Sequence, residues 1–135
     1  MQRKSKVYKI AVINANEDIV EAIELALNSE GYLTVGAHLI DFKRGRRDFL
    51  KFIDEEKPAL IILDVAPPYD ENWRYYKLLQ SNEKLKDMPF IITTTNETLL
   101  KKSIDEEEIN TIEIMGKPFD LHIILEKVEK ILPSK

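Results

Sequence analysis

The amino-acid sequence predicts an α/β fold, a doubly wound parallel sheet with helices on both faces, and two observations predict it. Apolar runs of strand length alternate with segments whose apolar residues recur at helical spacing, and this alternation occurs five times. One of the runs, residues 59–63, contains no polar side chain, as expected of a strand covered on both faces. Because parallel strands are joined by right-handed crossovers, the intervening helices must cover the sheet.

The first half of the chain supplies three of the predicted strands. Residues 7–13 form the first strand, and the helix after it stops at Gly31, a residue typical of the position after a helix C-cap. The second strand covers residues 32–40, and the second helix ends before Pro58. Apolar stripes on these two helices consist of Ile19, Ala22, Ile23, Ala26 and Leu27, and of Phe49, Leu50 and Ile53.

The second half of the chain repeats the pattern. Residues 90–93 form the fourth predicted strand, and residues 111–115 form the fifth. A weakly patterned helix near Leu99, Leu100 and Ile104 separates them. The apolar positions of the helix before the fourth strand are Trp73, Tyr76 and Leu79, and those of the last helix are Leu121, Ile124, Leu125, Val128 and Leu132.

Length and composition narrow the class of protein. A chain of 135 residues can bury one core, so we expect a single domain over residues 1–135 with no effector domain. The absence of cysteine excludes disulfides, thiol nucleophiles and Cys-ligated zinc. The net charge of −4 gives no general attraction to nucleic acid. The first apolar run is too short for a signal peptide or membrane span, so we expect a cytoplasmic protein.

Chemically useful side chains follow several of the predicted strands. Asp64 comes after the third strand, Thr94 after the fourth and Lys117 after the fifth. In a doubly wound sheet the ligand lies beyond the carboxyl ends of the strands, so these groups are expected to converge. A fixed, partly desolvated carboxylate suits a nucleophile toward phosphorus, while lysine and threonine provide a positive charge and a rotatable donor for phosphoryl oxygens.

These residues resemble a known signalling family. Three short motifs are similar to those of receiver domains of two-component response regulators. They are Ile62-Leu63-Asp64 with Pro68 four residues after the aspartate, the hydroxyl residue Thr94, and the triplet Lys-Pro-Phe at 117–119. The resemblance covers essentially the whole chain. It implies a five-stranded flavodoxin-like sheet with strand order 2-1-3-4-5.

The resemblance also implies roles for individual residues. Asp64 would be the phosphoacceptor for a histidine kinase or phosphotransfer protein, and Thr94 and Lys117 would hold the phosphate oxygens. The peptide bond before Pro118 is the candidate for a cis proline peptide, a conformation that X-Pro bonds reach at modest energetic cost. Such a domain is not itself an enzyme and acts in a phosphorelay through a separate output protein, with homodimerisation as a further possibility and neither nucleic acid nor membrane as a partner.

The first strand departs from the family pattern. Family members place two adjacent acids after this strand to bind Mg²⁺, whereas this chain has Asn14 and Ala15. Asp64 and Lys117 then carry charges that sum to zero, and Mg²⁺ prefers charged oxygen ligands. We therefore expect an internal Asp64–Lys117 ion pair with weak or no Mg²⁺ binding. Two neighbouring acids in the same loop, Glu17 and Asp18, offer a route to a metal through water, but they also suit the positive end of a helix N-capped by Asn16.

A basic segment, Lys43 to Arg47, lies in a connection that is longer than usual between the second strand and the second helix. A solvated loop is one interpretation of this segment. The other is a docking site for an acidic partner or an anion on the same edge as Asp64, with binding that falls steeply as salt is added.

Three functions remain in competition at this point. The first is a receiver that accepts a phosphoryl group on Asp64, and the second is a degenerate receiver that works as a phosphorylation-independent protein–protein interaction module. The third, a small flavin or nucleotide enzyme, is disfavoured because the four glycines form no phosphate-cradling loop.

Overall fold

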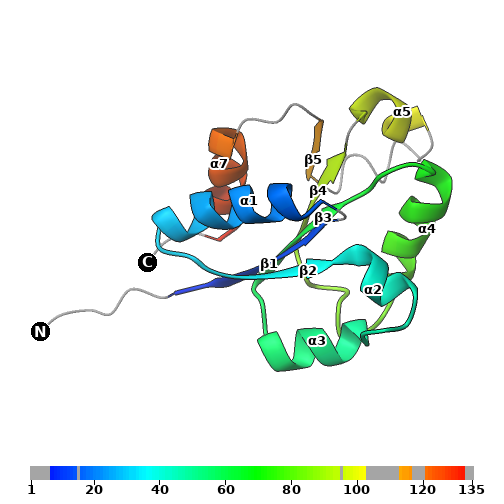
Figure 1. Cartoon of the computed structure of the whole chain (residues 1–135), viewed down its shortest axis with the longest axis horizontal. Coiled ribbons are helices and arrows are strands. Elements are labelled where there is room, and N and C mark those ends of the chain that lie inside the picture. Colours follow the sequence, from blue (N-terminus) through cyan, green and yellow to red (C-terminus); the bar gives the residue numbers. More distant parts are fainter. Residues whose placement is uncertain (1–6, 15, 95, 103–112, 117–120, 133–135) are drawn as a thin grey trace, which may run out of the picture.

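We describe a computed structural model of the chain, and the description covers residues 7–14, 16–94, 96–102, 113–116 and 121–132. Strands and helices alternate along this part of the chain, with the helices on the two faces of a central sheet (Figure 1). In the described residues no helix is long and apolar enough to cross a membrane.

The sheet is parallel, with the strand order β2-β1-β3-β4-β5. The predicted doubly wound α/β class and the order of the first four strands are confirmed, and β5 pairs with β4 at the edge, where the prediction places it. The strands are β1 (Lys9–Asn14), β2 (Leu33–His38), β3 (Leu60–Asp64), β4 (Phe90–Thr94) and β5 (Glu113–Gly116).

Two apolar cores form where the helices pack against the two faces of the sheet. One core lies between the sheet and α1 and α7, and the other lies between the sheet and α2, α3, α4 and α5. Residues of β3 alternate between them, so that Ile62 joins the first core and Ile61 the second. The helices are α1 (Glu17–Ser29), α2 (Leu39–Lys43), α3 (Phe49–Glu56), α4 (Tyr69–Gln80), α5 (Glu97–Lys102) and α7 (Leu121–Ile131).

The second strand and the connection after it differ from the prediction. Strand β2 ends at His38 rather than at residue 40, and the short helix α2 follows it directly. This helix buries Phe42, whose ring lies 5.1 Å from that of Phe49 and 5.3 Å from that of Phe52, measured between centroids. A single turn of helix is too short to show an apolar stripe, which is why the sequence pattern missed it.

Other boundaries agree more closely with the prediction. Gly31 follows the end of α1 with a φ of +92°, a conformation that favours glycine. Helix α3 ends at Glu56, just before the predicted stop at Pro58. Helix α5 contains the buried Leu100, while the predicted contributions of residues 104 and 111–112 lie outside the described residues.

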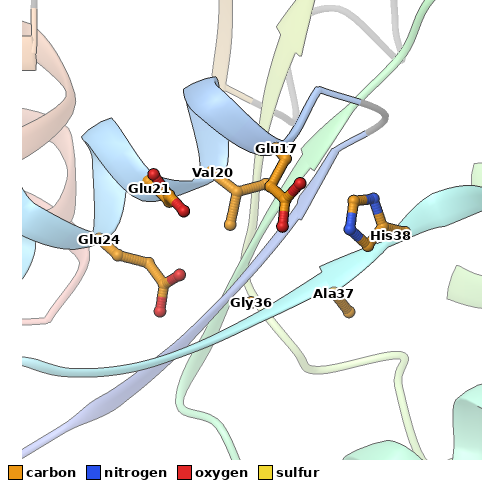
Figure 2. Close-up of a pocket in the computed structure, with 7 residues that line it drawn as sticks. All are labelled: Glu17, Val20, Glu21, Glu24, Gly36, Ala37 and His38. Carbon is orange, nitrogen blue, oxygen red and sulfur yellow. The ribbon is translucent and has the colours of Figure 1, made fainter.

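Gly36 in β2 allows α1 to pack directly on the strand (Figure 2). A Cβ atom at this position would lie 2.7 Å from Cγ1 of Val20 and 2.8 Å from Oε1 of Glu24, closer than van der Waals contact allows. The small residue therefore sets how closely helix and edge strand approach each other.

We predict that Gly36→Ala destabilises the protein by about 1–3 kcal/mol, because α1 must move away from β2 to admit the added methyl group. Urea unfolding followed by circular dichroism measures the loss. The same substitution made together with Val20→Ala should cost less than it does alone, since the nearest clashing atom is then gone. Equal costs in the two backgrounds would contradict the steric explanation.

Candidate functional site

The carboxylate of Asp64 lies at the carboxyl end of the central strand β3. The side chain is buried, with 4% of the residue exposed. In the register of β3 and β4, Asp64 pairs with Thr93, so that both side chains point to the same face of the sheet. The Thr93 hydroxyl donates a hydrogen bond of 2.8 Å to Oδ1 of Asp64. The strand pairing therefore fixes one oxygen of the predicted phosphoacceptor.

Thr94, the predicted phosphate-contacting residue, is also fully buried. It follows Thr93 in β4, and its Oγ1 accepts the backbone N–H of Asn96 at 3.4 Å, just before α5 begins. In the described structure, Thr93 is therefore the residue that contacts Asp64, whereas Thr94 contacts the backbone just before α5. A contact between Thr94 and a phosphate stays a prediction, while Thr93 is a site residue that sequence reasoning missed.

Asn14 ends β1 with 2% of the residue exposed. Its Oδ1 accepts the backbone N–H of Asn16 at 2.9 Å, so the amide oxygen is used within its own loop. Asn16 is the N-cap of α1, as predicted, and its side chain accepts the N–H groups of Asp18 at 2.9 Å and Ile19 at 3.2 Å. The first strand therefore ends in an amide-based turn rather than in a pair of acids.

The described residues do not fit a Mg²⁺ site. Within the part of the chain that the structure describes, no group of three His, Cys, Asp or Glu side chains is placed to hold a metal ion. At the strand ends Asp64 supplies a carboxylate, but Asn14 supplies a neutral oxygen that already accepts a hydrogen bond. Mg²⁺ gives up its waters reluctantly and is held in proteins mainly by carboxylates.

Glu17, one of the two acids in the first turn of α1, faces strand β2. Figure 2 shows the carboxylate of Glu17 directed over β2, on the side where His38 lies. The two residues line a pocket of about 200 Å³ between α1 and β2, together with Val20, Glu21, Glu24, Gly36 and Ala37. Glu24 in this pocket accepts a hydrogen bond of 2.8 Å from the Thr34 hydroxyl. Glu17 thus faces this pocket, and a water-mediated contact of Glu17 or Asp18 with a metal stays a prediction.

The loop after Asp64 contains a cis peptide bond between Pro67 and Pro68. Pro68 is the N-cap of α4, and its carbonyl accepts the N–H of Asn72 at 3.1 Å. The predicted cis peptide before Pro118 lies outside the described residues, as do Ala15 and Lys117.

The basic segment reaches this loop through Asn72. Nζ of Lys43 donates to Oδ1 of Asn72 and lies 3.3 Å from Oε2 of Glu71. Asn72 is buried, and its Nδ2 donates a hydrogen bond of 2.6 Å to the carbonyl of Ala66, two residues after Asp64. For Lys43, the prediction that the basic segment emerges on the Asp64 edge is confirmed. Asn72 itself gave no signal, because nothing in the local pattern distinguishes a buried helical asparagine from an exposed one.

Comparison with known proteins gives a limited sequence match. No family model matches the chain. The chain is 26% identical over 123 residues to the transcriptional regulatory protein GltR of Pseudomonas aeruginosa, which covers 91% of this chain and 48% of GltR. It is also 26% identical over 96 residues to the protein GrpE of Geobacillus stearothermophilus, which covers 71% of this chain and 43% of that protein. The chain thus spans about half the length of the curated relatives it matches.

The structural match is more extensive. The chemotaxis protein CheY4 of Vibrio cholerae superposes with a TM-score of 0.70 and 21% identity, covering 94% of this chain and all of CheY4 (100%). A signal receiver domain of a two-component histidine kinase from Clostridium thermocellum gives a TM-score of 0.72 and 19% identity, covering 93% and 98% of the two chains. The chain therefore has the flavodoxin-like α/β fold found in CheY-like response regulator receiver domains.

Proposed function

We propose that this chain is a receiver domain of two-component signal transduction that accepts a phosphoryl group on Asp64. The observation that carries the proposal is the placement of Asp64, a buried carboxylate at the carboxyl end of the central strand of a receiver fold. Its orientation by Thr93 supports the same role, because a nucleophile must be held in one direction to attack phosphorus in line. In this proposal Thr93 is a positioning residue.

The proposed reaction is transfer from a phosphohistidine of a kinase or phosphotransfer protein. An oxygen of Asp64 attacks phosphorus, a P–O bond forms as the P–N bond breaks, and the released imidazole nitrogen takes up a proton. In the proposal, Thr94 and Lys117 contact the phosphoryl oxygens. Thr94 has a rotatable hydroxyl, and among the described residues its oxygen has only the long hydrogen bond of 3.4 Å from the Asn96 N–H. The Lys117 ammonium would balance the added negative charge. Output passes to a separate protein.

We expect acetyl phosphate to phosphorylate the protein on Asp64. Intact-mass measurement after incubation should show the addition of one phosphoryl group in the wild type and none in Asp64→Asn. Asp18→Asn is the matched control, because it makes the same substitution at an exposed acid in the first turn of α1. A wild type that gains no mass in the presence of Mg²⁺ would rule out phosphotransfer to this chain.

A second function keeps the fold without the phosphotransfer. The observation that favours it is Asn14, which has no charge and whose amide oxygen accepts the Asn16 N–H. In this reading the chain is a degenerate receiver that binds a partner without phosphorylation. In both readings we propose that Asp64 and Lys117 form an ion pair and that Mg²⁺ binds weakly.

The Mg²⁺ proposal predicts the effect of restoring the missing acids. Asn14→Asp combined with Ala15→Asp should raise Mg²⁺ affinity at least about tenfold, because affinity rises with the number of charged oxygen ligands. Amide NMR shifts around Asp64 during a Mg²⁺ titration report the binding. Saturation of the wild type at sub-millimolar Mg²⁺ would contradict the proposal, and its loss in Glu17→Gln would identify the acid responsible.

The positioning role of Thr93 predicts a cost in stability. Thr93→Val removes the hydrogen bond to a buried carboxylate and should destabilise the protein by about 1–3 kcal/mol in urea unfolding. Thr93→Ser keeps the hydroxyl and should recover most of this loss, whereas Thr94→Val should cost less than Thr93→Val. If Thr93→Ser and Thr93→Val are equally destabilised, the methyl packing of Thr93 matters and its hydroxyl does not.

A further inference from the structure

The chain carries a compact basic surface that the proposed phosphotransfer does not use. Five cationic side chains and one acidic side chain lie between residues 43 and 51, in a chain whose net charge is −4. Lys43 turns toward Asn72 and Glu71, while four other side chains remain exposed around the turn between α2 and α3. We call these four the basic patch, and they are Arg44, Arg46, Arg47 and Lys51.

The basic patch surrounds a pocket. This pocket has a volume of about 420 Å³ and lies beside the first turn of α3, lined by Gly45, Arg46, Arg47, Asp48, Lys51, Phe52 and Glu55. The guanidinium of Arg47 lies over the rings of Phe52 and Phe42, at 4.8 Å and 5.3 Å from their centroids. Stacking of this kind holds the planar group in place, so less side-chain entropy is lost when it binds an anion.

The cations of the basic patch have few partners of their own. Among the described residues, the side chains of Arg44, Arg47 and Lys51 have neither a hydrogen-bond acceptor nor an ion-pair partner, and Arg46 has one long contact of 3.5 Å with Asp41. Asp48 lies among them as the N-cap of α3, where its Oδ1 accepts the backbone N–H of Lys51, and it forms no ion pair with Arg44, Arg47 or Lys51 among the described residues.

Other lysines on the same side of the sheet are paired. Lys9 lies 3.1 Å from Glu56, and Lys84 lies 3.1 Å from Asp54. These two lysines pair with acids of α3, whereas three of the four cations of the basic patch have no ion-pair partner in the part of the chain that the structure describes.

We infer that the basic patch binds an acidic segment of a partner protein, with its carboxylates in the pocket beside Arg46 and Arg47. Planar guanidinium groups match carboxylates in two-point contacts, and the pocket is large enough for a few side chains. Two acids, Asp48 and Glu55, line the same pocket. Two more, Asp54 and Glu56, lie in the last turn of α3, so the positive surface is short. The continuous phosphodiester backbone of a nucleic acid would be repelled by these acids. A short acidic peptide can end before it reaches them, or its own cations and amides can pair with them.

Lys43, the residue before the basic patch, connects this surface to the loop after Asp64 through Asn72. The contacts of Lys43 with Asn72 and Glu71 join α2 to the first turn of α4. The binding itself needs no chemistry at Asp64, so it is independent of the proposed phosphotransfer.

Fluorescence anisotropy of a labelled poly-glutamate peptide, added to the full chain at low salt, tests the inference. We expect saturable binding that weakens steeply as salt is raised, and no binding of a poly-glutamine peptide. Arg46→Ala combined with Arg47→Ala should weaken binding at least about tenfold, as expected for loss of central arginine contacts. Lys86→Ala combined with Lys102→Ala removes the same charge from exposed lysines elsewhere and should change affinity less than about twofold.

Further variants keep the test decisive. Because Arg47 packs on two phenylalanines, a second variant, Arg44→Gln combined with Lys51→Gln, removes two cations whose side chains have no hydrogen-bond or ion-pair partner among the described residues, and it should also weaken binding without loss of fold. Asp64→Asn should bind like the wild type, which separates this inference from the proposed phosphotransfer. Equal affinities of the Arg46/Arg47 variant and the lysine control would overturn the inference. Tighter, Arg46/Arg47-dependent binding of single-stranded oligothymidylate would also overturn it and identify a nucleic-acid surface instead.

Discussion

The burial of β3 on both faces is the constraint on which the rest of the structure depends. All five of its residues are buried, and the side chains of the four apolar ones alternate between the two apolar cores. A charged side chain is therefore tolerated only where the strand emerges from the helices, and Asp64 stands at that point. Even there, the carboxylate lies beside a hydroxyl donor from the neighbouring strand. The same burial that stabilises the fold thus holds the candidate nucleophile in a fixed and partly desolvated position.

The sequence was sufficient to predict the fold class, because apolar periodicity records burial directly. Residues 59–63 read as a central strand, and β3 occupies nearly the same range. Periodicity could not reveal α2, since one turn of helix has no repeat, nor could it choose between Thr93 and Thr94. That choice depends on strand register, and a shift of one residue sends a side chain to the opposite face. The site residue that was missed is therefore adjacent to the one that was predicted.

Polar contacts between elements were the least predictable part of the site. Lys43 and Asn72 are 29 positions apart, and Asn72 continues the chain of hydrogen bonds to the carbonyl of Ala66. Neither residue type is unusual at its position, and only the packing of α2 against α4 brings them together. The consequence is physical: displacement of Lys43 would remove one hydrogen bond to Asn72, the side chain that holds the loop after Asp64. Two consecutive hydrogen bonds thus join the basic segment to the loop that follows Asp64.

Asn14 shows how a neutral side chain can be accommodated at the buried end of β1. A buried carboxylate at this position would need a cation nearby, because burial of an unpaired charge is costly. The amide has no such requirement, and its oxygen satisfies the backbone N–H of Asn16 in the turn that leads to the N-cap of α1. The turn, the cap and the helix can thus form without a metal ion. At this strand end the hydrogen bond that shapes the turn requires an oxygen acceptor and not a charge.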